Sequence, residues 1–199
     1  WFAQSLPQTW WLWGWAAVIG VQVLALAFGP SIILPLFNKL SPLPEGPLRN
    51  RLLALGERAG FDMKQIQVID GSKRSAHSNA LFTGFGRFRK AILFDTLLDQ
   101  MEPRELEAVL AHEIGHCKRG HIPKLLTSSA LSLLVMFGAL GYLAAHPDLL
   151  APFGFEAPSG ITGVAAVLLL ASVAAGTVTF WFSPLSHRRQ RTFEYEADA

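Results

Sequence analysis

The chain has 199 residues, of which 51% are hydrophobic and only 16% are charged, and its mean hydropathy is positive at +0.32. Soluble domains carry about 25% charged residues on average, so this composition argues against a wholly soluble protein and favours a small soluble part joined to membrane segments. The net charge of +2 gives no reason to expect nucleic acid or another polyanion as a partner, and the single cysteine, Cys117, excludes an internal disulfide.

The first 38 residues predict a membrane-spanning helix. They contain no Asp, Glu, Lys or Arg, and the run Trp10–Phe28 is close to the roughly 20 apolar residues that cross a bilayer core. Tryptophans crowd its first turns, where aromatic rings favour the headgroup zone. A signal peptide fits less well because the segment has no basic start. Pro30 and Pro35 are expected to bend or end the helix, so 1–38 is interpreted as a transmembrane helix and bend.

The next region, 39–124, holds 14 of the 17 Lys and Arg residues and is interpreted as the soluble part. Its Pro-rich start, 41–47, is expected to be a rigid linker, after which Pro47 is suited to open a helix. Apolar residues at helical spacing continue that helix as far as Gly60. Pro103 opens a second predicted helix, in which apolar and charged residues alternate at the same spacing.

Between these two helices, short apolar runs predict strands at 66–69 and 91–94. The intervening segment, 70–90, is rich in Ser, Gly, Arg and Lys, and it is expected to be an exposed loop that contains a further strand at 80–83. Helices and strands together predict a small α+β region.

Two more charge-free stretches follow, and they predict transmembrane helices at 125–146 and 161–186, joined by an external loop at 147–160. Small residues scattered through both stretches suit close helix packing in lipid. The alternative is a buried hairpin in a large soluble core, which three such segments in a short chain disfavour. The remaining residues, 187–199, are expected to form a charged helix. The predicted fold is therefore a mainly α, multi-pass membrane protein with one α+β region.

The distribution of Lys and Arg predicts how the chain is oriented. None lies in 147–160, whereas 39–124 carries 14 and the C-terminal end carries 3. Basic residues concentrate on the cytoplasmic side of membrane proteins, and three spans place both basic regions on the same side. The soluble region is therefore expected to face the cytoplasm.

The second predicted helix carries the pattern His-Glu-Ile-Gly-His at 112–116. His112 and His116 are four residues apart, so both imidazoles project from one helix face and can bind one metal ion. Glu113 lies beside them, and because bound zinc lowers the pKa of a water to about 7, a neighbouring carboxylate can take the proton. Gly115 leaves room for substrate or another backbone. The alternative is two chance histidines on an amphipathic helix, which the full pattern disfavours.

Catalytic zinc needs a third protein ligand, and several candidates are open. His121 follows His116 by five residues, about a turn and a half of helix, so it is not expected to fold back to the same ion. His146 is expected on the far side of the membrane. Glu194 and Asp198 are four residues apart and could divide the roles of ligand and support of a ligand histidine, although such a charged run can also be a solvated helix face. The other candidates are His77, His187 and Glu196.

Five segments, taken in chain order, carry a family resemblance. They are Pro-Leu-Pro-Glu-Gly at 42–46, Gly-Ser-Lys-Arg-Ser-Ala-His-Ser-Asn-Ala at 71–80, Ile-Leu-Phe-Asp-Thr-Leu-Leu at 92–98, Val-Leu-Ala-His-Glu-Ile-Gly-His at 109–116 and Arg-Thr-Phe-Glu-Tyr-Glu-Ala-Asp-Ala at 191–199. Over most of its length the chain thereby resembles the type-1 CAAX prenyl proteases, a family of integral-membrane zinc endopeptidases. The second and third segments are more specific to that family than the metal motif is.

The resemblance implies a zincin-like catalytic region that binds one zinc ion per chain and cleaves peptides, with prenylated CAAX C-termini as substrates. The implied zinc ligands are His112, His116 and Glu194. Asp198 is implied to support a histidine ligand, and Asn79 is implied to contact the substrate main chain together with Ala80. That contact fits a peptide that adds as a strand to an exposed sheet edge.

Relatives in that family have further transmembrane helices before the position of Trp1, and a segment after Ala199 whose histidine steadies the oxyanion. The chain is therefore expected to be a fragment that holds the metal site without the whole catalytic chamber. Two alternative functions are a heat-stress type of membrane quality-control protease and a non-catalytic, zinc-stabilised membrane scaffold. Glu113 argues against the scaffold, because a structural zinc site needs no carboxylate that activates water.

Overall fold

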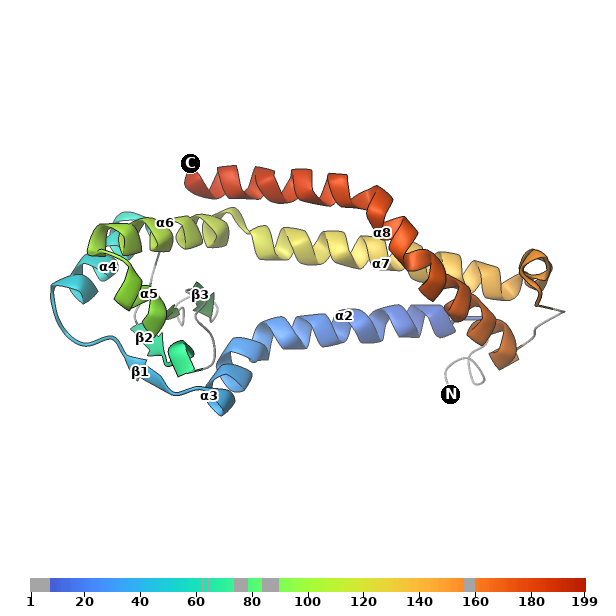
Figure 1. The fold of residues 1–199 in the computed structure, drawn as a ribbon, viewed down its shortest axis with the longest axis horizontal. Coiled ribbons are helices and arrows are strands. Elements are labelled where there is room, and N and C mark those ends of the chain that lie inside the picture. Colours follow the sequence, from blue (N-terminus) through green and yellow to red (C-terminus); the bar gives the residue numbers. More distant parts are fainter. Residues whose placement is uncertain (1–7, 62, 64, 74–78, 84–89, 156–159) are drawn as a thin grey trace. The chain divides into compact units, whose positions relative to one another are not determined.

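The computed structural model describes residues 8–61, 63, 65–73, 79–83, 90–155 and 160–199. The chain forms two compact units. One consists of 1–23 and 123–190, and the other of 24–122 and 191–199. The first is built from long helices, and the second holds the sheet, the shorter helices and the C-terminal end of the last helix (Figure 1).

Among the described residues, three helices are long and apolar enough to cross a membrane, in agreement with the predicted multi-pass fold class. They are Trp10–Phe37, His121–Ala145 and Ile161–Asp198. The last two belong to helices α7 (His121–Ala145) and α8 (Gly160–Asp198), with a 3-10 helix at Pro147–Phe153 between them. No break separates 161–186 from 187–199, because α8 is continuous through both.

Pro30 was expected either to bend or to end the first helix, and it does not end it. Helix α2 (Trp10–Phe28) passes into a π-helical turn at Gly29–Ile33 and then into α3 (Leu34–Phe37). A proline has no N–H for the usual helical hydrogen bond, and a π-turn changes the hydrogen-bond register while the chain stays helical. The apolar helical segment therefore continues to Phe37, inside the region 1–38 that the sequence assigned to a helix and bend.

Helices α2 and α7 pack antiparallel within their unit. The indole N–H of Trp15 donates to the backbone oxygen of Ala130 at 2.9 Å. A Cβ atom at Gly141 would lie 2.5 Å from the Trp11 ring, so the absence of a side chain lets the tryptophan lie against the backbone of α7. The predicted role of small residues in helix packing is confirmed at this position.

In its described part, the second unit contains a four-stranded mixed sheet in the order β1-β2-β4-β3. Strand β2 is parallel to β4, while β1 and β3 are antiparallel to their neighbours. The strands are β1 (Leu40–Pro42), β2 (Gln65–Ile69), β3 (Ala80–Thr83) and β4 (Lys90–Phe94). The three predicted strands are confirmed to within one residue. The linker expected at 41–47 is wrong over its first residues, because β1 pairs there with β2, and a proline is tolerated in such an edge strand.

Helices α4 (Pro47–Arg58), α5 (Asp95–Gln100) and α6 (Pro103–Arg119) belong to this unit and share one core with the sheet. Helix α6 contacts both α4 and β3 (Figure 1). Leu106, Leu110 and Ile114 of α6 are at most 2% exposed and pack into that core. A capping box between Glu102 and Glu105 fixes the start of α6. One face of α6 is thereby held against the core, and the other is left for polar side chains.

Candidate metal centre

The two histidines of the metal motif lie on α6 away from its buried stripe. Their Nε2 atoms are 3.0 Å apart, and their side chains are 28% and 23% exposed for His112 and His116. The apolar residues on the other face fix the rotation of the helix, because they are the ones buried in the core. The two imidazole rings therefore face away from the core, and any partner side chain that joins them has to come from an element other than α6.

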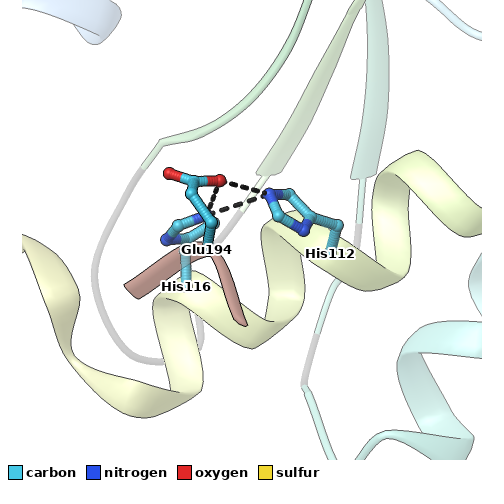
Figure 2. Close-up of side chains that lie close together, drawn as sticks. All are labelled: His112, His116 and Glu194. Atoms are coloured by element: carbon cyan, nitrogen blue, oxygen red, sulfur yellow. Dashed lines mark hydrogen bonds and ion pairs between the residues drawn. The ribbon is translucent and has the colours of Figure 1, made fainter. Parts of the chain in front are cut away.

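That partner comes from the C-terminal end of α8. The Oε2 atom of Glu194 lies 3.2 Å from Nε2 of His112 and 3.5 Å from Nε2 of His116. Figure 2 shows the carboxylate and the two imidazole rings pointing toward one another. Within the described residues these three side chains form the one group of His, Cys, Asp or Glu that could hold a metal ion. We call His112, His116 and Glu194 the metal group.

The spacing of the three atoms matches what zinc requires. Zinc binds nitrogen and oxygen at about 2.0–2.2 Å, so neighbouring corners of its tetrahedron lie about 3.3–3.5 Å apart. The observed separations of 3.0, 3.2 and 3.5 Å are within about 0.3 Å of this spacing. Two imidazoles and one carboxylate are also a ligand set that catalytic zinc uses, with the fourth position left for water or substrate.

Asp198 lies one helical turn beyond Glu194 and contacts the outer nitrogen of His112. The Nδ1–H group of His112 donates to Oδ1 of Asp198 at 2.7 Å. Burial by itself would lower the pKa of His112, but this hydrogen bond and the charges of Asp198 and Glu194 outweigh it, so the pKa is raised. The bond also fixes the tautomer of His112 in which the proton is on Nδ1, so that Nε2 carries none and could bind a metal ion.

Glu113 lies next to the metal group and is partly buried. Burial raises the pKa of its carboxyl group, and the charge of Glu194 adds to this, while the two histidines act in the opposite direction. A raised pKa means that the carboxylate holds a proton more tightly than a solvated glutamate does. This is the property that a general base beside an activated water requires.

Gly115 lets the end of α8 approach α6. A Cβ atom at this position would lie 2.9 Å from the Cα and 3.0 Å from the carbonyl carbon of Ala197, and it would also collide with the Ala197 oxygen. The backbone approach anticipated from the sequence is thus made by α8. Because Ala197 lies between Glu194 and Asp198 in the sequence, this close contact sets how near both carboxylates come to α6.

Replacing Gly115 by Ala is expected to weaken zinc binding and to destabilise the protein by about 1–3 kcal/mol. The atoms in the way are backbone atoms, so relief requires α8 to shift and to carry Glu194 with it. The measurement is zinc affinity by competition with a chelator, together with the unfolding temperature. Gly176→Ala is the control, because a Cβ atom there meets nothing within 4 Å. Equal zinc affinity of both variants would contradict this role for Gly115.

His121 occupies a position that the sequence did not predict. Its Nδ1 atom lies 2.8 Å from Nδ1 of His116, on the side of that ring away from the metal group. His121 is not a member of the metal group, which is consistent with the expectation that it would not reach the same ion. It nevertheless folds back onto His116, because α6 ends at Arg119 and Gly120 adopts the left-handed conformation with φ 65°, which turns the chain so that α7 begins at His121. The signal was a glycine directly after the basic end of a helix.

The predicted substrate residues lie at the edge of the sheet. Ala80 begins β3, the last strand in the sheet order, and Asn79 precedes it with its Oδ1 accepting from the Ala80 N–H at 2.9 Å. Strand β3 contacts α6, the helix that carries the metal motif. Among the other candidates, His77 lies outside the described residues, and His146 and His187 do not belong to the metal group.

A His-Glu-x-x-His helix, a carboxylate from a later helix and an edge strand against the first helix are features of zinc-dependent metallopeptidases. A model of peptidase family M48 matches residues 42–199. A second model, described as the CAAX prenyl protease N-terminal region with five membrane helices, matches residues 1–39. The protein belongs to peptidase family M48, and the resemblance stated from the sequence is confirmed.

Individual relatives agree with this placement. The chain is 37% identical over 191 residues to CAAX prenyl protease 1 of Saccharomyces cerevisiae, covering 90% of this chain and 42% of that protein. A CAAX prenyl protease 1 homolog from Oryza sativa subsp. japonica is 34% identical over 186 residues, covering 93% and 43%. The crystal structure of S. mikatae Ste24p superimposes with a TM-score of 0.78 at 34% identity, covering 99% of this chain and 48% of that one. The chain therefore spans about half the length of these relatives.

Proposed function

We propose that the protein is an integral-membrane zinc endopeptidase whose metal site is formed by His112, His116 and Glu194. The observation that carries the proposal is the convergence of their three ligand atoms at the spacing of a zinc tetrahedron. Membership of a metallopeptidase family supports a bound metal. A zinc ion held there would polarise the scissile carbonyl and make water a better nucleophile.

In this proposal Glu113 is the general base. It takes a proton from the attacking water and returns it to the amine that leaves, so one carboxyl group serves both steps of peptide hydrolysis. Asp198 holds His112 in the tautomer that presents Nε2 to the metal.

The substrate peptide is proposed to add as a strand to the edge of β3 that pairs with no other strand among the described residues. The N–H of Phe94 donates to the oxygen of Asn79, so Asn79 and Leu81 turn their main-chain groups toward β4. The main-chain groups of Ala80 and Phe82 consequently point to the open edge. The Asn79 side chain already accepts from the Ala80 N–H, which places it at the start of this edge, where an extended peptide would be held.

We propose prenylated CAAX C-termini as the substrate class, so that the activity is CAAX-type processing. We also propose that the active site faces the cytoplasm. The names of the relatives support the substrate, and the basic residues concentrated in 39–124 support the orientation. A lipid bilayer is the natural setting, because three helices in the described part of the chain are long and apolar enough to span it.

The test uses the whole natural protein that carries this chain, purified in detergent and reconstituted in liposomes. We expect about one zinc per chain and cleavage of a farnesylated CAAX peptide. A chelator should abolish cleavage, and added zinc should restore it. The matched control is the same peptide without the farnesyl group. Cleavage of unfolded membrane proteins with no preference for the prenylated peptide would favour the quality-control alternative, and zinc binding with no cleavage of any peptide would favour the scaffold.

A further inference from the structure

Besides the contact between His112 and Asp198, a second series of hydrogen-bonded side chains extends from the metal group, and it begins at His116. The Nδ1 atoms of His116 and His121 lie 2.8 Å apart, and Nε2 of His121 lies 3.1 Å from Oε2 of Glu196. The rings of the two histidines meet edge to face, with centroids 4.9 Å apart. Both ring nitrogens of His121 are thus engaged, one toward a candidate metal ligand and the other toward a carboxylate.

Proton counting assigns one tautomer to each ring. His116 can bind a metal through Nε2 only if that atom carries no proton, so in the neutral ring the proton is on Nδ1. That N–H faces Nδ1 of His121, which must then be the acceptor. The proton of His121 is consequently on Nε2, where it donates to the carboxylate of Glu196. One pair of neutral tautomers therefore gives every hydrogen bond between Glu196, His121 and His116 both a donor and an acceptor.

Burial separates His121 from an ordinary surface histidine. Its side chain is 2% exposed, and its ring stacks on Phe193 with centroids 4.3 Å apart and an interplanar angle of 11°. The stack and the hydrogen bond to Glu196 hold the ring in one orientation. Because a buried polar group without partners is costly, a His121 held this way favours the arrangement in which His116 donates to it.

We propose that His121 and Glu196 are positioning residues for the metal site, forming a relay that fixes the tautomer and the ring orientation of His116. The proposal rests on the proposed metal site and deepens it. It gives each histidine of the motif a carboxylate from α8. Asp198 acts directly on His112, and Glu196 acts on His116 through the imidazole of His121. Outer partners of this kind change metal affinity by about 10–100-fold.

The test compares two replacements of His121 whose order depends on its role. His121→Phe keeps an aromatic ring against Phe193 and removes both nitrogens. His121→Asn loses the ring but places a carbonyl oxygen near the position of Nδ1, where it can accept from His116. We expect zinc affinity to fall about 10–100-fold in His121→Phe and to be partly restored in His121→Asn. A role in packing alone predicts the reverse order.

Glu196 offers a matched pair that does not disturb a buried ring, because its side chain is 36% exposed. Glu196→Gln keeps an acceptor for the His121 N–H and is expected to stay close to wild type, whereas Glu196→Leu removes it and should lower zinc affinity. Zinc affinity is measured by chelator competition in the whole natural protein. The visible absorption spectrum of the cobalt-substituted protein gives a second readout, because it reports the ligand geometry directly.

The outcomes are distinguishable from those of the proposed function. If the wild-type protein binds no zinc, the metal site itself is refuted. If the wild type binds zinc and His121→Phe binds it equally well, or more tightly than His121→Asn, the relay is refuted and the metal site stands. Should His121→Phe fail to fold, the Glu196 pair decides, and unchanged zinc affinity and cobalt spectra in both of its members overturn the relay.

Discussion

Replacing Glu113 by Gln is expected to abolish peptide cleavage while zinc stays bound. The amide is close in size to the carboxylate but cannot accept a proton from water, and removing a general base costs about 100- to 10,000-fold in rate. The ligand atoms of the metal group belong to other residues, so the zinc content should remain that of the wild type. The measurements are the rate of peptide cleavage and the zinc content of the same preparation.

The control for this variant is Glu107→Gln on the same helix. Glu107 is paired with Arg51 at 2.6 Å and is remote from the metal group, so its replacement removes one negative charge from α6 without touching the site. The lost ion pair involves partly exposed side chains and should contribute little to stability. Equal cleavage by Glu113→Gln and the wild type would refute the proposed mechanism. Loss of zinc from Glu113→Gln would instead mean that this residue helps to hold the metal.

Replacing Glu194 by Ala is expected to remove zinc and, with it, all cleavage. The Oε2 atom of Glu194 is the third corner of the metal group, and its loss leaves two imidazoles. Because replacement of an outer partner already costs about 10–100-fold in metal affinity, loss of a direct ligand should cost more. The measurements are the zinc content after purification and the zinc occupancy reached when zinc is added in excess.

Glu196→Ala is the comparison, since Glu196 lies two residues away on the same helix. It contacts His121 rather than the metal group, so its replacement should weaken zinc binding within the range of an outer partner, and zinc in excess should fill the site. Zinc lost from Glu196→Ala and retained by Glu194→Ala would mean that the third ligand is assigned to the wrong residue.

Much of the fold could be predicted because its signals are local. The length and apolarity of the three spans are properties of single segments, and Pro103 marks the start of α6 in the sequence as it does in the structure. The strand at Leu40–Pro42 was missed because its pairing partner, β2, lies further along the chain. The π-turn that contains Pro30 was missed because a proline permits more than one outcome in a helix.

By itself, the sequence determined the chemical class of the site. His112, Glu113 and His116 belong to one helix, and helical periodicity fixes how their side chains are disposed. The family resemblance implied that Glu194 and Asp198 join them, but only the tertiary structure decided how the end of α8 reaches α6 and where His121 lies. The approach of Ala197 to Gly115 brings the end of α8 against α6, and the left-handed Gly120 turns His121 back onto His116. Both contacts depend on how separate helices meet, and no local pattern encodes the distance between them.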